Sequence, residues 1–143
     1  MPAQNPPSGY YTVTPYLAVP GVAKLIDFLQ TVFDAKVVER MTRADGSLGH
    51  CEVRIGDSIV MMGEPTDPAK ARPSNLYVYV PDVDATYRRA LTQGAKSERE
   101  PTDQFYGDRS GGFVDPSGNT WWIATHKEDM SPEEMQRRAK QQL

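Results

Sequence analysis

A chain of 143 residues is long enough for one domain that buries roughly two-thirds of the surface exposed by its unfolded form. Its net charge of −3 gives no support for nucleic-acid binding, which usually leaves a basic patch. The single cysteine, Cys51, excludes an internal disulfide and favours a reducing compartment. Residues 1–9 lack the basic start and apolar run of a secretory signal, and no stretch approaches the ~18 apolar residues that span a bilayer. The sequence therefore predicts a cytoplasmic protein.

The first half of the chain is predicted to hold four strands and one helix. Residues 1–11, rich in proline, are expected to form a disordered arm. Apolar residues recur at helical spacing from Val22 to Phe33, which predicts an amphipathic helix. The strands expected in this half cover residues 12–19, 36–41, 49–55 and 59–62.

The second half follows the same order. Residues 64–74 carry three prolines and connect the halves. Asp82 is expected to cap a helix that ends at Gly94 in the left-handed conformation. The strands expected here cover residues 76–80, 97–100, 112–115 and 120–124. Ser131-Pro132-Glu133-Glu134 is a capping box and predicts a C-terminal helix.

The two halves repeat each other. Tyr16-Leu-Ala-Val-Pro-Gly-Val22 opens the first half, and Tyr77-Val-Tyr-Val-Pro-Asp-Val83 opens the second half in the same phase. This repeat predicts an α+β domain over residues 12–126, built from two βαβββ modules that form a half-open, barrel-like cavity. The modules are expected at about residues 12–64 and 75–126, and the C-terminal helix at 127–143.

The opening strands should have one face against the helices and one face uncovered. Leu17 and Val19 lie on the first of these faces, whereas Tyr16, Tyr77 and Tyr79 lie on the second. Cavities with aromatic walls and a few polar groups are where small molecules bind. The sequence therefore predicts a small-molecule site lined by these three tyrosines.

Several motifs of the core are similar to those of a known superfamily. Three of them are Leu25-Ile-Asp-Phe-Leu29, Val80-Pro-Asp-Val-Asp84 and Asp115-Pro-Ser-Gly-Asn-Thr-Trp-Trp-Ile123. Through these motifs the chain resembles the vicinal oxygen chelate superfamily of glyoxalase I, bleomycin-resistance proteins, fosfomycin-resistance enzymes and extradiol dioxygenases. Two further segments resemble glyoxalase-like proteins of the phosphonate-operon type: His50-Cys-Glu-Val-Arg-Ile-Gly-Asp57 and Asp103-Gln-Phe-Tyr-Gly-Asp-Arg109.

The resemblance also implies where a metal ion would be held. The metal enzymes of the superfamily use His, Gln or Glu at up to four positions, which fall here on Thr14, Met61, Asn75 and Trp122. Divalent metals prefer imidazole, carboxylate or thiolate ligands, and none of these four residues supplies one. The sequence therefore predicts no metal and no cofactor. In this it resembles the bleomycin-resistance proteins, which bind their drug in an aromatic-lined groove.

His50 and Glu52 share the uncovered face of one strand. They could act as a general base with an orienting carboxylate, or as two ligands of a displaced metal site. The alternative is a polar network or an ion pair of Glu52 with Arg54, which strand neighbours often form. The second interpretation is favoured, because two ligands alone are a weak metal signal.

Four further residues are predicted to contact a ligand. Met61 and Trp122 are equivalent in the repeat and should face the cavity, with Trp122 either a stacking platform or a core filler. Phe105 and Tyr106 lie in an irregular segment and are expected at the cavity rim.

The leading functional prediction is a metal-free homodimer that binds a small aromatic or planar molecule, such as an antibiotic-like ligand. An alternative is a glyoxalase-like lyase or isomerase that uses His50 and Glu52. A third class is a structural or regulatory dimer without any ligand.

Overall fold

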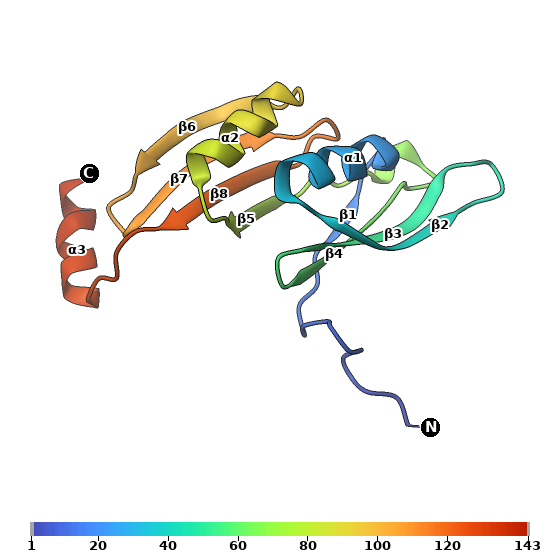
Figure 1. Cartoon of the computed structure of the whole chain (residues 1–143), viewed down its shortest axis with the longest axis horizontal. Coiled ribbons are helices and arrows are strands. Elements are labelled where there is room, and N and C mark those ends of the chain that lie inside the picture. Colours follow the sequence, from blue (N-terminus) through green and yellow to red (C-terminus); the bar gives the residue numbers. More distant parts are fainter. Residues whose placement is uncertain (1, 143) are drawn as a thin grey trace. The chain divides into compact units, whose positions relative to one another are not determined.

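The computed structural model describes residues 2–142, which form eight strands, three α-helices and one short 3₁₀ helix (Figure 1). The elements of the first half are β1 (Tyr16–Ala18), α1 (Val22–Phe33), β2 (Lys36–Thr42), β3 (Leu48–Ile55), β4 (Ser58–Gly63) and η1 (Pro68–Lys70). Those of the second half are β5 (Asn75–Tyr79), α2 (Val83–Thr92), β6 (Lys96–Asp103), β7 (Asp108–Val114), β8 (Thr120–His126) and α3 (Pro132–Gln141).

Each half of the described chain builds one mixed, four-stranded sheet. The strand order is β1-β4-β3-β2 in the first sheet and β5-β8-β7-β6 in the second. The opening strand pairs in parallel with the closing strand, and the other neighbours are antiparallel. Neither sheet closes on itself within residues 2–142. The α+β class, the two βαβββ modules and the C-terminal helix are thus confirmed.

Helix α1 covers one face of the first sheet (Figure 1). Its buried residues lie at the predicted helical spacing: Val22, Leu25, Ile26, Phe28, Leu29 and Val32. On the strand side Leu17 and Val19 are fully buried, whereas Tyr16 is 49% exposed. The predicted division of β1 into a covered and an uncovered face is therefore confirmed.

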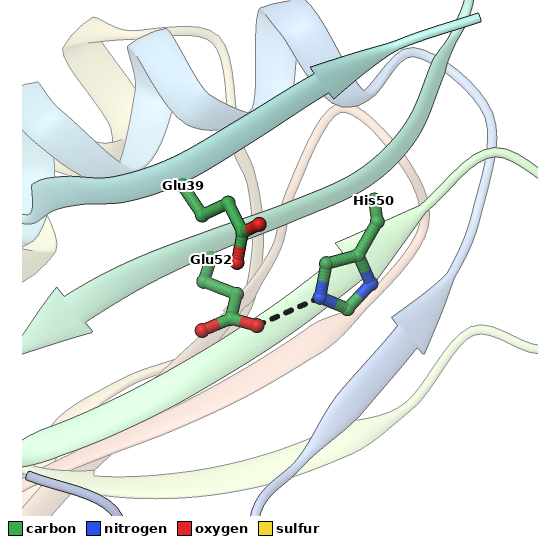
Figure 2. A group of neighbouring side chains, drawn as sticks. All are labelled: Glu39, His50 and Glu52. Carbon is green, nitrogen blue, oxygen red and sulfur yellow. Dashed lines mark hydrogen bonds and ion pairs between the residues drawn. The ribbon is translucent and has the colours of Figure 1, made fainter. Parts of the chain in front are cut away.

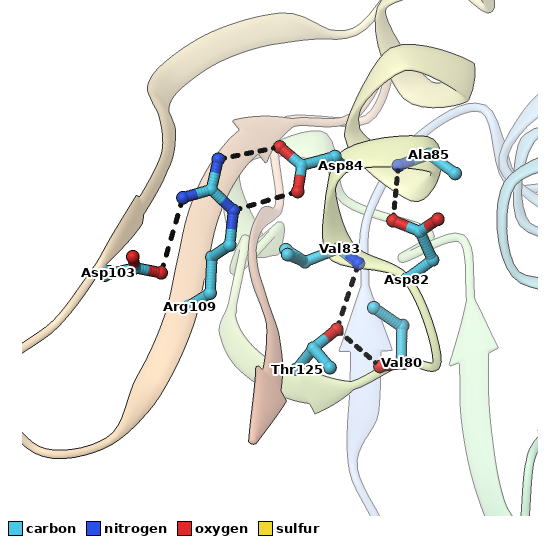
Figure 3. A network of polar contacts seen from close by, with 8 residues as sticks. All are labelled: Val80, Asp82, Val83, Asp84, Ala85, Asp103, Arg109 and Thr125. Carbon is cyan, nitrogen blue, oxygen red and sulfur yellow. Dashed lines mark hydrogen bonds and ion pairs between the residues drawn. The ribbon is translucent and has the colours of Figure 1, made fainter. Parts of the chain in front are cut away.

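Helix α2 packs on β6, β7 and β8 of the second sheet. The Asp82 carboxylate caps it by accepting a hydrogen bond from the Ala85 N–H at 3.1 Å. The Thr125 hydroxyl accepts from the Val83 N–H at 3.0 Å and donates to the Val80 carbonyl at 2.8 Å (Figure 3). These contacts fix the start of α2 against the end of β8.

The first strand is shorter than predicted. Residues 12–14 lie outside the sheet, and the Thr14 hydroxyl donates to the Tyr11 carbonyl in a local turn. Pro15 has no N–H to offer, so only its carbonyl contributes, accepting from the Met61 N–H.

The hairpin of β6 and β7 is longer than predicted. Residues 104–109 were expected to be irregular, yet Asp108 and Arg109 already belong to β7. The turn is tight: the Gln104 N–H donates to the Asp108 carbonyl at 2.7 Å. Gly107 supplies the required left-handed conformation, with φ at +100°. Both strands contain many polar residues, so an alternation of apolar and polar residues does not show their full length.

Contacts divide the chain into two compact units, Met1–Ser74 with Pro116–Asn119, and Asn75–Asp115 with Thr120–Leu143. Each unit contains one of the sheets. The residue boundaries predicted for the modules stay predictions, as does the cavity expected from them. No helix within residues 2–142 has the length and apolar character needed to cross a membrane.

Candidate functional site

The uncovered face of the first sheet carries a polar network around Glu52. The Glu52 side chain is 5% exposed, and its Oε2 lies 2.7 Å from His50 Nε2. The Tyr10 hydroxyl donates to the other oxygen, Oε1, and this hydrogen bond raises the pKa of Tyr10. On the opposite face of β3, Cys51 and Val53 are fully buried, and burial raises the pKa of the Cys51 thiol.

The network that the sequence favoured is confirmed, but the predicted partner is wrong. Glu52 is bound by His50 and Tyr10 rather than by Arg54. The Arg54 side chain is exposed and its guanidinium lies beside Gly9. A buried carboxylate needs close donors, which the histidine and the tyrosine supply without bringing a guanidinium into the sheet.

The structure adds Glu39, a residue that the sequence analysis missed. On β2, Val37 pairs with Val53 and Glu39 pairs with Glu52, so Val38 is an extra residue, or bulge. One ligand atom from each of Glu39, His50 and Glu52 lies within 4.8 Å of the others (Figure 2). The position of a one-residue bulge cannot be read from the alternation of apolar and polar residues in the sequence. The cluster is therefore seen only once the strand pairing is known.

Tyr16 and Met61 complete this face of the first sheet. The ring centroids of Tyr16 and His50 are 5.7 Å apart. Met61 lies opposite Tyr16 on one side and opposite Glu52 on the other. Four of the predicted ligand-contacting residues are thus neighbours, although contact with a ligand stays a prediction.

The uncovered face of the second sheet is organised around Asp108, which the sequence analysis did not single out. This carboxylate is 4% exposed and accepts hydrogen bonds from the hydroxyls of Tyr77 at 2.7 Å and Tyr79 at 3.0 Å. The hydroxyls of these two predicted site residues thus donate to a carboxylate of the protein itself. The rings remain accessible, with Tyr77 44% and Tyr79 63% exposed.

His126 is the third partner of Asp108. Its Nδ1 lies 2.7 Å from Asp108 Oδ1, and its Nε2 lies 2.7 Å from Asp129 Oδ1. Burial alone would raise the pKa of Asp108, but hydrogen bonds from His126, Tyr77 and Tyr79 outweigh it and lower that pKa. The hydrogen bonds to Asp108 and Asp129 raise the pKa of His126. The pair therefore favours a carboxylate facing an imidazolium.

The adjacent tryptophans point to opposite faces, as successive residues of a strand do. Trp121 is fully buried and its indole N–H donates to Asp115 at 2.7 Å. Trp122 is partly exposed and lies over Gly112, where an added Cβ would come within 2.5 Å of its ring. The Arg99 guanidinium lies 5.3 Å from the centroid of the same ring.

Phe105 and Tyr106 form the turn between β6 and β7. Their rings stand perpendicular, with centroids 5.2 Å apart. A cleft of about 610 Å³ lies close by, and its lining residues are Asp103, Gln104, Gly107, Asp108, Arg109, Lys127, Glu128 and Arg138. Neither ring lines this cleft, and their predicted contact with a ligand stays a prediction.

Arg109 forms a structural ion pair. Its guanidinium binds both carboxylate oxygens of Asp84 on α2, at 2.9 and 3.0 Å (Figure 3). This contact lowers the pKa of Asp84. Successive residues of a strand point to opposite faces, so Arg109 faces the helix while Asp108 faces the tyrosines.

The positions at which the superfamily's metal enzymes hold a divalent ion do not fit one here. Thr14 offers a hydroxyl already bonded to Tyr11, and Met61 offers a thioether. The corresponding residues of the second unit are an amide, Asn75, and an indole, Trp122, whose N–H is only a donor. None of these groups is a preferred ligand of a divalent metal.

Comparison with known proteins agrees with the fold. The uncharacterized protein Rv0887c of Mycobacterium tuberculosis is 33% identical over 135 residues, which span 87% of this chain and 79% of that protein. The uncharacterized protein Mb0911c of Mycobacterium bovis has the same identity over 89% of its length.

Solved structures share the architecture at low identity. TioX from Micromonospora sp. ML1 superposes with a TM-score of 0.69 at 24% identity, covering 81% of this chain and 98% of TioX. The PhnB protein from Bacillus cereus superposes with a TM-score of 0.66 at 16% identity, covering 80% of this chain and 99% of PhnB. At such identities the likeness shows the fold alone. The model of the Glyoxalase/Bleomycin resistance protein/Dioxygenase superfamily matches residues 10–123, and the chain belongs to that superfamily.

Proposed function

We propose that the protein binds a small aromatic or planar molecule, such as an antibiotic-like compound, without a metal at the four superfamily positions. One observation carries the proposal: the uncovered faces of the two sheets present partly exposed aromatic rings. Tyr16, Tyr77 and Tyr79 are each more than two-fifths exposed. Exposed rings beside a few fixed polar groups are typical of small-molecule sites.

The polar groups that would orient such a molecule differ between the faces. The first sheet offers the His50–Glu52 pair next to Tyr16. The second offers the Asp108–His126 pair next to the rings of Tyr77 and Tyr79. Charged groups held by their own partners need little rearrangement on binding, which reduces its cost.

Tryptophan fluorescence provides the test. Trp122 is partly exposed and Trp121 is fully buried, so a bound planar molecule is expected to quench Trp122 saturably. Metal-free bleomycin, named in the superfamily's description, is the first probe, followed by a panel of planar aromatic compounds. At about 100 times its dissociation constant a ligand stabilises the fold by ~2.7 kcal/mol, a shift of roughly 10 °C in Tm.

Three variants separate ring contacts from other effects. Tyr79→Ala should weaken binding by about tenfold, comparable to the loss of one aromatic contact, whereas Tyr79→Phe keeps the ring and should bind normally. Tyr11→Ala is the matched control, because Tyr11 is 57% exposed but lies outside the sheets. The proposal fails if no compound quenches Trp122, or if EDTA abolishes binding by a His50→Ala variant as well as by the wild type.

The contact between His50 and Glu52 favours one alternative, a glyoxalase-like lyase or isomerase. In that reaction His50 would move a proton and Glu52 would orient the imidazole. The hemithioacetal of methylglyoxal and glutathione is a suitable substrate. His50→Ala should then lower turnover by about 10²-fold or more, and His126→Ala should not. A wild-type protein without turnover, or a His50→Ala variant as fast as wild type, eliminates the alternative.

We further propose that the protein acts as a homodimer in the cytoplasm. Support comes from composition, since a lone cysteine suits a reducing compartment. Each unit also leaves one sheet face without a covering helix from its own repeat, and such faces need to be covered.

A further inference from the structure

We propose that Glu39, His50 and Glu52 bind a divalent transition-metal ion such as Zn²⁺, at a place distinct from the four superfamily positions. The three residues belong to the first unit and lie on β2 and β3. One imidazole and two carboxylates form a mixed ligand set of the kind that zinc accepts. The proposal concerns the metal alone and does not depend on the binding of an aromatic molecule.

The three ligand atoms need only small shifts to reach the distances found around a coordinated ion. With bond lengths of about 2.0–2.2 Å, the ligand atoms of a tetrahedral zinc site lie about 3.3–3.6 Å apart. His50 Nε2 and Glu52 Oε2 are 2.7 Å apart, and Glu39 brings a carboxylate oxygen within 4.8 Å of both (Figure 2). Glu39 is exposed, so a rotation of its side chain can close the remaining gap.

The bulge at Val38 places the third ligand. With regular pairing after Val37, position 38 would lie opposite Glu52, and Glu39 would turn to the other face. The extra residue instead sets two carboxylates directly opposite each other on the same face. Like charges in that position destabilise a strand pair. A cation between them removes this repulsion, and bulges often re-aim a side chain beside a functional site.

Tyr10 supports one of the ligands from outside the cluster. Its hydroxyl donates to Glu52 Oε1, across 42 positions in the sequence, and this leaves Oε2 directed toward His50. A carboxylate that binds a metal is commonly held by such a second hydrogen bond. Three ligands on one sheet face leave further coordination positions for water or for an oxygen of a bound molecule.

Calorimetric titration of ZnCl₂ into the EDTA-treated and dialysed full chain tests the proposal. We expect saturable binding of one Zn²⁺ per chain, weakened about tenfold or more in Glu39→Gln and in His50→Ala, and about tenfold in Tyr10→Phe. Glu98→Gln is the matched control, because Glu98 is an exposed strand glutamate on β6. It should bind Zn²⁺ as wild type does.

His126→Ala is the second control, since it removes the only other histidine of the chain. Circular dichroism of each variant establishes that it is folded before titration. The proposal is overturned if the wild type takes up no Zn²⁺, or if Glu39→Gln binds as tightly as Glu98→Gln. It is equally overturned if His126→Ala abolishes binding and His50→Ala does not. Since no aromatic compound is present, these outcomes leave the proposed function untouched.

Discussion

Trp121→Phe is expected to destabilise the protein by about 2–3 kcal/mol, because it removes a hydrogen bond to a charged group and part of a fully packed ring. Trp121 is fully buried, and its indole N–H lies 2.7 Å from the carboxylate of Asp115, which is itself 4% exposed. Phenylalanine fills most of the space but cannot donate that hydrogen bond. The urea concentration at the midpoint of unfolding, followed by circular dichroism, measures the loss.

The neighbouring residue provides the control. Trp122→Phe makes the same chemical change one position along β8, on the partly exposed face. We expect it to cost less than about 1 kcal/mol, since Trp122 rests on Gly112 and Arg99 rather than inside the core. If both variants lost the same free energy of unfolding, the two tryptophans could not lie on opposite faces of the sheet.

Asp108→Ala is the second substitution with a large expected effect. It removes the acceptor of three hydrogen bonds, from Tyr77, Tyr79 and His126. Hydrogen bonds to a buried charge contribute about 1.5–3 kcal/mol, but the exposed tyrosines can bond to water in the variant. We therefore expect a loss of about 2–3 kcal/mol, measured by urea unfolding at neutral pH.

The same network predicts how stability depends on pH. The pKa of Asp108 is lowered by folding, so its contribution is present above the ordinary value of 3.8 and is lost as the pH falls further. The pKa of His126 is raised, so its contribution is complete below the ordinary value of 6.5 and is lost as the pH rises through the higher native value. Stability from this network is therefore greatest between the two ordinary values.

Asp103→Ala serves as the control for Asp108→Ala. Asp103 is exposed and its contact with Arg109 is long, at 3.4 Å, so its loss should change stability by less than about 0.5 kcal/mol. Asp108→Ala should also flatten the pH profile, whereas Asp103→Ala should keep it. If Asp108→Ala kept the wild-type dependence of stability on pH, the Asp108 network could not be the source of that dependence.

Much of the fold could be predicted because the buried positions of helices and strands recur as apolar residues at regular spacings in the sequence. The apolar spacing of α1 gives its limits at Val22 and Phe33, and these agree with the structure. The start of α2 could be predicted from its capping residue, because the Asp82 carboxylate accepts a hydrogen bond from a backbone N–H of the first helical turn. Strand limits were less accurate at β1, because Pro15 and the turn at Thr14 depend on local hydrogen bonds that apolar alternation does not encode.

The candidate site was only half predictable. His50 and Glu52 could be placed on one face of β3, because residues two apart on a strand share a face. Glu39 could not be placed on that face, because the direction of its side chain depends on the bulge at Val38. Asp108 was overlooked because its segment reads as a loop, although it belongs to β7 and receives three side chains brought together by strand pairing.

The burial of Cys51 has a practical consequence for watching this molecule move. A thiol reacts with alkylating reagents as the thiolate, and burial both hides the Cys51 sulfur and disfavours that form. Labelling therefore requires the helix-covered face of the first sheet to open. Because Cys51 lies between His50 and Glu52, the speed of its modification reports how often the core beneath these two residues opens, with no probe added to the chain.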